Sequence, residues 1–418
     1  MTKIQPQILK GFRDFLPDQM VIRQKVIDIL RGVFESYGYE PLETPALEYA
    51  ETLLGKSGKE AEKLMYLFKD SGGRAVGLRY ELTVSLARVM AQYSNLPLPF
   101  RRYQMQPVWR AEKPQRGRYR EFWQCDVDII GTTSPLADAE IIEIAYRSLI
   151  ALGFKKFLIK INSREILFKL LEEAGILQEK QASTLIAIDK LERIGQEGVA
   201  KELVAKGLTN QTIAKIFTLI NQTKPDETLK QVFRILQLNK VPSEYYQFTP
   251  TLVRGLEYYT GPIFESFVYE PKIGSLCGGG RWDKLIGKFT GKDLPATGIT
   301  VGLERIVDVI KELNLWPDIK PTKTQVLVTI FSPEYLEKSI KVASLLRSRI
   351  KVNTELYPDP EAKLDKQLKY ADKKGIPWVV IIGPEEVNNN SLTIKDLKNR
   401  KQESISQNKL QTYFNQLK

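Results

Sequence analysis

Apolar residues recur at helical spacing close to the N-terminus of the chain. Within residues 17–37 they include Val21, Val26 and Ile29, and Gly38, a residue suited to the C-terminus of a helix, follows the stretch. This pattern predicts an amphipathic helix at the start of the fold. Residues 43–131 then carry short apolar runs between glycine and proline turns, which is typical of strands.

Residues 124–130 alternate polar and apolar side chains, and this alternation predicts a half-buried strand. Successive side chains of a strand point to opposite faces. We therefore expect Gln124, Asp126 and Asp128 to share one face of that strand.

The middle of the chain has a different character. Residues 163–241 are rich in leucine, isoleucine, lysine, glutamate and glutamine, with Pro225 as their one proline, which predicts an inserted module of successive helices. Strand character returns in residues 248–269, and the glycines of residues 277–280 precede a helix expected to begin near Gly298. One large unit is therefore expected to close around the insertion.

A polar segment with two prolines, residues 317–321, predicts a linker to a separate C-terminal domain. Beyond it, apolar strand-like runs at residues 325–330 and 378–382 enclose helical patterns at residues 333–349 and 361–374. This order is the pattern of a small α/β layer fold. The expected fold class of the chain is α/β and multidomain.

Composition narrows the chemistry that is available. The 418 residues are 43% apolar and 27% charged, and no stretch approaches the roughly 20 apolar residues that cross a bilayer, so no membrane role is expected. The polar N-terminus lacks the apolar core of a secretory signal, which favours the cytoplasm. Two cysteines alone make neither a disulfide framework nor a zinc site, and the absence of histidine excludes imidazole as a catalytic base.

Basic residues cluster within residues 100–120 against a single acid, Glu112. They are Arg101, Arg102, Arg110, Lys113, Arg116, Arg118 and Arg120. A cationic loop between two strands can close over a phosphate chain, and an aromatic residue at its exit can stack on a base. The alternative is a solvated loop on a basic protein. The aromatic residues around the segment and the formal charge of +12 favour a polyanionic ligand.

Part of this cluster resembles motif 2 of the class II aminoacyl-tRNA synthetases, in the form found in the histidyl-tRNA synthetase family. The resemblance rests on Arg110-Ala111-Glu112, Arg118-Tyr119-Arg120-Glu121-Phe122 and Gln124-Cys125-Asp126. It implies that Arg110 holds the α-phosphate of ATP and the aminoacyl carboxylate. It also implies that Glu112 contacts the adenine amino group, that Phe122 stacks on adenine, and that Arg118 belongs to the ATP site.

Residues 298–305, Gly-Ile-Thr-Val-Gly-Leu-Glu-Arg, resemble motif 3 of the same class. The resemblance implies a strand that leads into a helix whose arginine, here Arg305, reaches the γ-phosphate. Taken alone, such glycine spacing is more often plain packing, but its position after motif 2 favours the ATP site. Mg²⁺ should accompany ATP, bound mainly through phosphate oxygens, with Glu304 as a candidate ligand.

Two further segments resemble histidine-specific sequences of this family. Residues 252–261, Leu-Val-Arg-Gly-Leu-Glu-Tyr-Tyr-Thr-Gly, contain Arg254, which the resemblance makes catalytic together with the motif 2 arginine, and Tyr258 and Tyr259, which it places at the histidine. An aromatic-rich strand is the alternative, and it would leave the arginine unexplained. The glycines of residues 275–281, Ser-Leu-Cys-Gly-Gly-Gly-Arg, would let backbone approach a ligand closely.

Other side chains would complete the histidine site. With Arg110 and Arg254 they are Glu81 and Thr83 at the α-amino group, Gln124 at the backbone end of the amino acid, and Asp128 with Tyr258 at the imidazole. A site that bonds both ring nitrogens can reject analogues by roughly 10⁴ to 10⁵. For Thr83 the alternative is a helix N-cap. The sequence departs from the family at Trp282, where tyrosine is usual. An indole donates a hydrogen bond but cannot accept one, so the local hydrogen-bond network must differ.

The resemblance extends over nearly the whole chain. It implies a class II catalytic domain over residues 1–322, with an antiparallel sheet flanked by helices (an α+β core), and a helical insertion at about residues 163–245. Residues 323–418 would form an α/β anticodon-binding domain. The implied activity is ATP-dependent ligation of L-histidine to tRNA(His) through a histidyl-adenylate, by a homodimer.

Two other interpretations remain. A catalytically inactive paralogue, such as the synthetase-like regulatory subunit of ATP phosphoribosyltransferase, would bind histidine and a partner enzyme, but relatives of that kind lack an anticodon domain. An RNA-binding or stress-sensing protein would use the fold as a module, and intact ATP and histidine segments argue against it.

Overall fold

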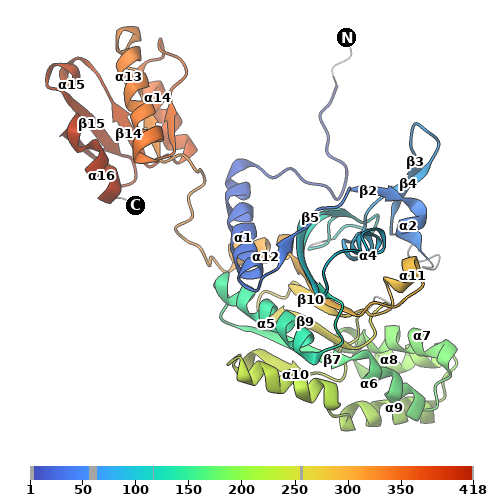
Figure 1. The fold of residues 1–418 in the computed structure, drawn as a ribbon. Coiled ribbons are helices and arrows are strands. Elements are labelled where there is room, and N and C mark those ends of the chain that lie inside the picture. Colours follow the sequence, from blue (N-terminus) through green and yellow to red (C-terminus); the bar gives the residue numbers. More distant parts are fainter. Residues whose placement is uncertain (1–3, 56–63, 116, 255–257, 417–418) are drawn as a thin grey trace. The chain divides into compact units, whose positions relative to one another are not determined.

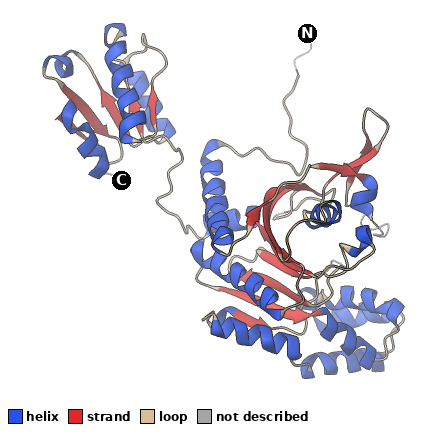
Figure 2. Cartoon of the chain, in the orientation of Figure 1, coloured by secondary structure: helices blue, strands red, loops and turns tan. Residues whose placement is uncertain are grey.

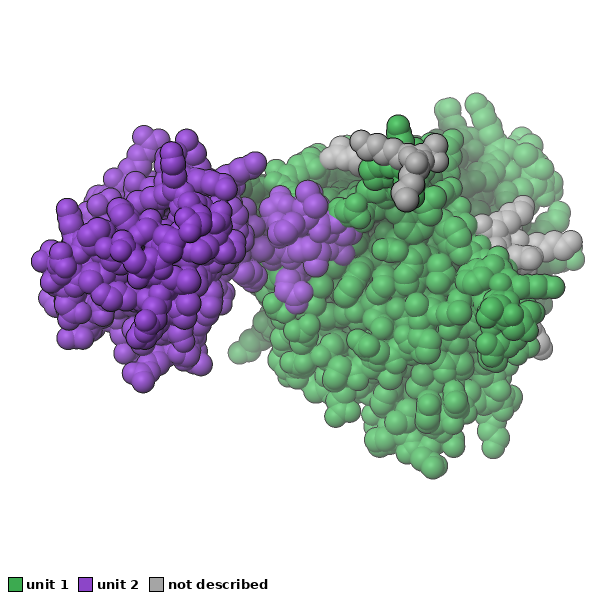
Figure 3. Space-filling view, turned by 90° about the horizontal axis from the view of Figure 1, so that it is seen from above, with its two compact units in different colours: residues 1–14, 25–316 green, residues 15–24, 317–418 purple. Residues whose placement is uncertain are grey.

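The computed structural model describes residues 4–55, 64–115, 117–254 and 258–416 (Figure 1). Arg116 of the cationic loop and residues 255–257 of the histidine-specific segment lie outside the described residues. The internal contacts of the chain divide it into two compact units, residues 1–14 with 25–316 and residues 15–24 with 317–418 (Figure 3). Among the described helices, none is long and apolar enough to cross a membrane.

The first unit is built on a large sheet that is mainly antiparallel (Figures 1 and 2). Its strands are β1 Glu40–Pro41, β5 Phe100–Trp109, β6 Glu121–Ile130, β7 Phe157–Ser163, β8 Tyr246–Phe248, β9 Pro262–Val268, β10 Cys277–Arg281 and β11 Ala296–Gly302. They lie in the order β1-β5-β6-β11-β10-β9-β7-β8, and only the outer pairs β1–β5 and β7–β8 are parallel within the described residues.

Helices flank this sheet. They are α1 Pro17–Ser36, which belongs to this unit from Lys25 on, α2 Ala50–Leu54, α4 Thr83–Gln92, α5 Pro135–Ala151, α11 Gly287–Thr290 and α12 Leu303–Glu312. Helix α5 packs along β9, β10, β11 and β6, and α12 packs along β6 and β11. Figure 1 shows α4 on the concave side of the curved sheet. The expected antiparallel sheet flanked by helices is confirmed.

A smaller antiparallel sheet adjoins α2. It has the order β2-β4-β3, with β2 Leu47–Tyr49, β4 Ala75–Leu78 and β3 Tyr66–Lys69. Strand β4 is followed by the segment that ends in Glu81 and by α4, so this small sheet helps to place Glu81 against the larger one.

Residues 163–241 form successive helices, as their composition predicts. These are α6 Arg164–Glu173, α7 Gln178–Ile188, α8 Leu191–Ala205, α9 Asn210–Gln222 and α10 Glu227–Leu238. Side-chain caps start several of them: the Asp226 carboxylate accepts a hydrogen bond from the Leu229 amide at 2.8 Å, and Thr209 accepts one from Thr212. Helix α8 is broken at Gly195, whose φ of +68° suits glycine. Helix α10 packs on α5.

The second unit has a five-stranded sheet with helices on both faces. Its strands are β12 Val326–Val328, β13 Thr354–Leu356, β14 Trp378–Ile381, β15 Ser391–Asp396 and β16 Lys401–Ser406, in the order β13-β12-β14-β15-β16. Its helices are α13 Leu336–Leu345, α14 Leu364–Lys374, α15 Pro384–Asn388 and α16 Leu410–Gln416. Val326 and Val328 pack with α13 and α16, whereas Leu327 packs with α14 on the opposite face. The small α/β layer fold predicted from the alternating apolar runs is confirmed.

Three local predictions were wrong. The helix expected near Gly298 begins at Leu303, because residues 296–302 pair with both β6 and β10 and so extend as strand β11. Residues 249–254 and 258–261 lie outside strands, so within the described residues the strand expected over residues 248–269 is confined to β8 and β9. Residues 124–130 are buried on both faces rather than one, because the polar face of β6 is covered as well as the apolar face.

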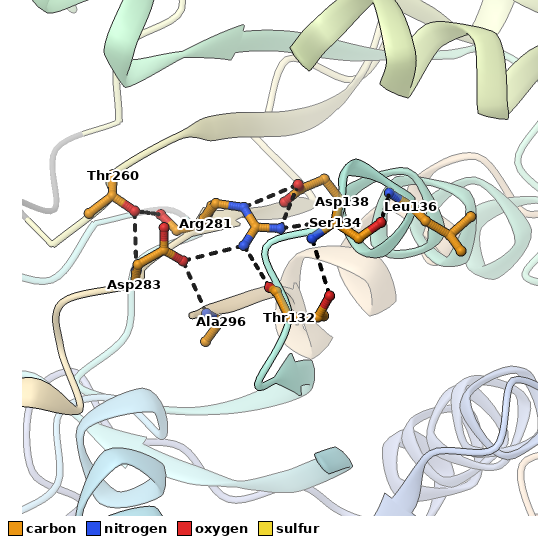
Figure 4. A network of polar contacts seen from close by, with 8 residues as sticks. All are labelled: Thr132, Ser134, Leu136, Asp138, Thr260, Arg281, Asp283 and Ala296. Atoms are coloured by element: carbon orange, nitrogen blue, oxygen red, sulfur yellow. Dashed lines mark hydrogen bonds and ion pairs between the residues drawn. The ribbon is translucent and has the colours of Figure 1, made fainter. Parts of the chain in front are cut away.

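A buried ion pair joins β10 to the start of α5 (Figure 4). The Arg281 guanidinium donates to Asp138 Oδ2 at 2.7 Å and 3.1 Å, and both side chains are almost fully buried. It also donates to the Thr132 carbonyl at 2.9 Å and reaches Asp283 at 3.3 Å. Arg281 therefore ends the glycine run of β10 as a structural residue that fixes the sheet to α5.

Replacing Asp138 with alanine should lower the free energy of unfolding by about 3–5 kcal/mol, because Arg281 would stay charged and buried without its main partner. The control is Asp28→Ala, which removes an exposed ion pair with Arg31 and should cost at most about 1 kcal/mol. Urea unfolding followed by circular dichroism measures both. Equal losses of unfolding free energy in the two variants would show that the buried ion pair stabilises the fold no more than the exposed one.

Candidate active site

A pocket of about 280 Å³ opens on the polar face of the larger sheet. Most side chains that the sequence analysis assigns to histidine, ATP or Mg²⁺ line it. They are Glu81, Thr83, Arg110, Glu112, Arg118, Phe122, Gln124, Arg254, Tyr258, Tyr259, Glu304 and Arg305. These residues come from segments that are far apart in the sequence, and Asp128 is the one predicted site residue that does not line the pocket.

Glycines leave the sheet backbone bare at the floor of the pocket, next to the Thr300 side chain. Gly278 of β10 lies opposite Thr300 of β11, and Gly298 of β11 lies opposite Asp128 of β6. A Cβ atom on Gly278 would overlap the Arg254 guanidinium, and one on Gly298 would overlap the Asp128 carboxylate. Glycine is therefore needed at both positions because charged groups press directly against the backbone.

Arg254 forms one wall above this floor. Its Nη1 atom donates to Glu265 Oε1 at 2.6 Å, and its guanidinium lies 5.5 Å from the centre of the Tyr259 ring. Burial alone would lower the pKa of Arg254, but Tyr259 and Glu265 hold that pKa above its ordinary value. The side chain is thus a fixed cation at the pocket.

A carboxylate and two hydroxyl groups form another part of the pocket wall. The Tyr258 hydroxyl donates to Glu81 Oε2 at 3.2 Å and is also hydrogen-bonded with Thr83. Burial raises the pKa of Glu81 to about 7, although Arg110 and hydrogen bonds from Tyr258 and Tyr80 act in the opposite direction. The N-cap alternative for Thr83 was wrong, because the N-cap position of α4 is Leu82 and Thr83 is the first helical residue.

Three arginines gather at the mouth of the pocket. Arg110 donates to the Tyr80 carbonyl at 3.1 Å, and its guanidinium lies 5.1 Å from the centre of the Phe122 ring. Arg305 donates to the Gly117 carbonyl at 3.2 Å and to the Ser275 carbonyl at 2.6 Å.

The charges at this mouth are unbalanced. Burial, followed by the nearby cations Arg118 and Arg110, lowers the pKa of Arg305. The one ion pair described among these side chains joins Arg118 to Glu112, at 3.9 Å. Cations that repel one another in a partly buried site are stabilised by a bound anion. The arrangement suits a polyphosphate.

The two arginines at the start of the predicted cationic cluster lie elsewhere. Arg101 and Arg102 belong to β5, so only the residues after Trp109 form the loop between β5 and β6. Arg102 is fully buried and forms an ion pair with Asp128 at 2.7 Å, and Arg101 pairs with Glu140. The prediction that they belong to the phosphate-binding loop was wrong because the strand continues through them.

Asp128 shares the sheet face of the pocket with Gln124, but its carboxylate lies over Gly298 and does not line the pocket. Burial raises the pKa of Asp128, whereas Arg102 and a hydrogen bond from the Trp282 indole lower it. The neighbouring Asp126 shows the same upward pKa shift from burial. Trp282 therefore supplies a donor to this carboxylate, a contact in which the missing acceptor capacity of an indole has no cost.

Three important residues escaped the sequence analysis. Thr300 accepts a hydrogen bond from Gln124 Nε2 at 3.2 Å, and Glu265 holds Arg254. Arg79 is buried and donates to Gln106 Oε1 at 2.9 Å, next to the site. Period-two spacing with Gly298 and Gly302 could have pointed to Thr300. No sequence pattern pointed to the other two, because their contacts join separate elements and leave no periodic signal in the sequence.

A second, larger hollow of about 710 Å³ lies between the small sheet and α4. Its lining includes Leu47, Tyr49, Arg88 and Tyr93. It contains none of the predicted site residues, and its lining lacks the cluster of arginines that marks the smaller pocket. We therefore take the smaller pocket as the candidate active site.

Comparison with known proteins agrees with this geometry. The family model described as histidyl-tRNA synthetase matches residues 11–306, and the one described as anticodon binding domain matches residues 325–417. The chain is 42% identical to the histidine–tRNA ligase of Aeropyrum pernix over 415 residues, which covers 93% of each chain. It is 40% identical to the histidine–tRNA ligase of Rhodopirellula baltica over 428 residues, with 96% of each covered.

A solved structure shows the same architecture. The crystal structure of histidyl-tRNA synthetase from Nostoc sp. PCC 7120 matches with a TM-score of 0.87 and 30% sequence identity, and all of both chains is covered. Sequence, fold and family models agree over nearly the full length. The chain therefore belongs to the histidyl-tRNA synthetase family.

Proposed function

We propose that this chain attaches L-histidine to tRNA(His), using ATP and passing through a histidyl-adenylate, with release of AMP and diphosphate. The observation that carries the proposal is a single pocket with two chemically different ends. One end offers a buried carboxylate and tyrosine hydroxyls, which suit an amino acid with a polar ring. The other end offers converging arginines, which suit the phosphates of ATP.

At the amino-acid end, Glu81 and Thr83 bind the α-ammonium group of histidine, and Gln124 lies at the backbone end of the ligand. Tyr258 contacts the imidazole from the pocket wall, with Tyr259 beside it. Asp128 lies over Gly298 on the same sheet face and does not line the pocket, which supports an indirect role: its charge, paired with Arg102, sets the electrostatic environment near the imidazole.

At the nucleotide end, Phe122 stacks on adenine, Glu112 contacts the adenine amino group, and Arg118 and Arg305 bind the outer phosphates. Arg110 and Arg254 hold the α-phosphate and the histidine carboxylate. A carboxylate oxygen attacks the α-phosphorus, and the bond to the bridging oxygen breaks so that diphosphate leaves with its electron pair. The two arginines stabilise the charge that develops on the phosphoryl oxygens.

Mg²⁺ fits the site as a companion of ATP. Glu304 lines the pocket at the start of α12 and can offer an oxygen ligand, as can Glu112. In the described part of the chain, no three carboxylate or thiol groups converge as a metal site would require. The ion would neutralise phosphate charge, and the protein would hold it chiefly through the nucleotide.

Residues 1–322 serve as the catalytic domain and residues 323–418 as the anticodon-binding domain, and the helical insertion falls at about residues 163–245. In the second unit the turn between β15 and β16 concentrates positive charge suited to RNA phosphates. Its cations are Lys395, Lys398, Arg400 and Lys401. The enzyme acts in the cytoplasm, where tRNA is charged.

The chain works as a homodimer. Support comes from the larger hollow beside the small sheet, where Leu47, Tyr49 and Tyr93 are largely exposed. Exposed apolar side chains around a groove are typical of protein interfaces.

Exchange between ATP and labelled diphosphate tests the activation step. The rate should depend on histidine and on no other amino acid. Arg254→Ala should reduce the rate by about 10² to 10³, because it removes one of the two cations at the α-phosphate. Absence of exchange in well-folded protein would instead support the regulatory-paralogue interpretation.

The KM for histidine should depend on pH through Glu81. Its pKa of about 7 means that the carboxylate gains charge as the pH rises from about 6 to about 8, so attraction for the ammonium group grows and KM should fall by roughly tenfold. Glu81→Gln should raise KM and remove this part of the dependence. Titration of free histidine affects both proteins equally, so parallel pH profiles would contradict the role of Glu81.

Leu47→Lys should weaken dimerisation at least about tenfold, because the two-fold interface would bury two charges, one from each protomer, in place of apolar side chains. Sedimentation velocity measures the equilibrium. Leu238→Lys, at an exposed apolar residue at the end of α10, is the matched control and should leave the dimer intact. A wild-type monomer would refute the dimer.

A further inference from the structure

The position of Arg254 depends on side-chain contacts rather than on regular backbone. The residue lies in the segment between β8 and β9, outside any strand or helix. A catalytic cation in such a segment has to be held by its neighbours, because a displacement of about 1 Å can cost 10²-fold in rate. The neighbours of its guanidinium are therefore part of the machinery.

Besides Tyr259, two adjacent strands provide these neighbours. Glu265 of β9 pairs directly with Gly278 of β10, so both belong to the same face of the sheet. Arg254 fills the space that a side chain at position 278 would occupy, and its Nη1 atom is 2.6 Å from Glu265 Oε1. The glycine gives the guanidinium room, and the carboxylate fixes its orientation.

We propose that Glu265 is a positioning residue for histidine activation, acting through Arg254 and not by contact with a substrate. The proposal rests on the proposed function. Glu265 does not line the pocket that contains Arg254, which separates its role from that of a substrate ligand. The charge-assisted hydrogen bond to Glu265 and a side-chain hydrogen bond with Tyr259 hold the guanidinium, and they leave its remaining N–H groups for the phosphate and the carboxylate of the reactants.

Asp189 tests whether negative charge alone explains the influence of Glu265 on Arg254. It follows α7 in the helical insertion and interacts electrostatically with Arg254, but it is exposed. Removing its charge changes the field at Arg254 while leaving the hydrogen bond from Glu265 in place. Positioning by contact predicts a large effect at Glu265 and a small one at Asp189.

A double-mutant cycle measured by histidine-dependent ATP–diphosphate exchange tests the proposal. Glu265→Gln, of nearly the same shape, should reduce the rate by about 10²-fold. In the Arg254→Ala background the same substitution should have no further effect, because the group it positions is gone. Asp189→Asn should stay within about threefold of wild type, since an exposed charge acts weakly.

The outcomes are distinct. Losses at Glu265 and Arg254 that multiply in the double variant would overturn the proposal, as would a faster rate in Glu265→Gln, which would mean that Glu265 holds Arg254 away from substrates. Equal losses in Glu265→Gln and Asp189→Asn would also overturn it. Thermal melting checks the fold, and Glu265→Asp replaces the glutamine variant in the cycle if that variant unfolds. Absence of exchange in wild-type protein would refute the proposed function itself, before any variant is compared.

Discussion

The active-site face of the large sheet depends on one constraint, the absence of side chains at neighbouring positions of β10 and β11. Gly278 and Gly298 allow Arg254 and Asp128 to lie flat against the backbone, where any Cβ atom would collide with them. The partners of these charges are Glu265 from β9, next to β10, and Arg102 from β5, next to the β6 strand that carries Asp128. The depth of the pocket and the placing of its charges follow from this bare stretch of sheet.

Charge balance explains why the rest of the site has its form. Beside the pocket Arg102 pairs with Asp128, and on the opposite face of the sheet Arg281 pairs with Asp138, so these buried ions are paired within the protein. At the mouth, the cations outnumber their acidic partners, and Glu81 on the amino-acid side is buried enough to have a raised pKa. A triphosphate bound at the mouth and an ammonium group bound at Glu81 would complete both sets of interactions. The pocket is therefore prepared for two substrates that react with each other.

Much of this could be predicted from the sequence, and the remainder could not, for physical reasons. Motif residues such as Arg110, Arg254 and Arg305 converge as expected, because short motifs keep their local geometry. The strand of Gln124 and Asp128 was also foreseen from its period of two. The burial of Asp128 against Arg102 was not, since pairing across strands depends on register that alternation alone does not determine. The start of α12 at Leu303 was missed because sheet pairing on both sides of β11 extends the strand beyond its glycines.

The central claim is that Arg110 and Arg254, from different parts of the chain, both bind the α-phosphate, while the amino acid lies between Glu81 and Tyr258. A crystal structure with a non-hydrolysable histidyl-adenylate analogue tests it most directly. The account predicts that the linking group that replaces the α-phosphate is hydrogen-bonded by both arginines, with the ammonium group at Glu81 and the imidazole at Tyr258. An analogue bound without Arg254, or with its imidazole away from Tyr258, would contradict the account.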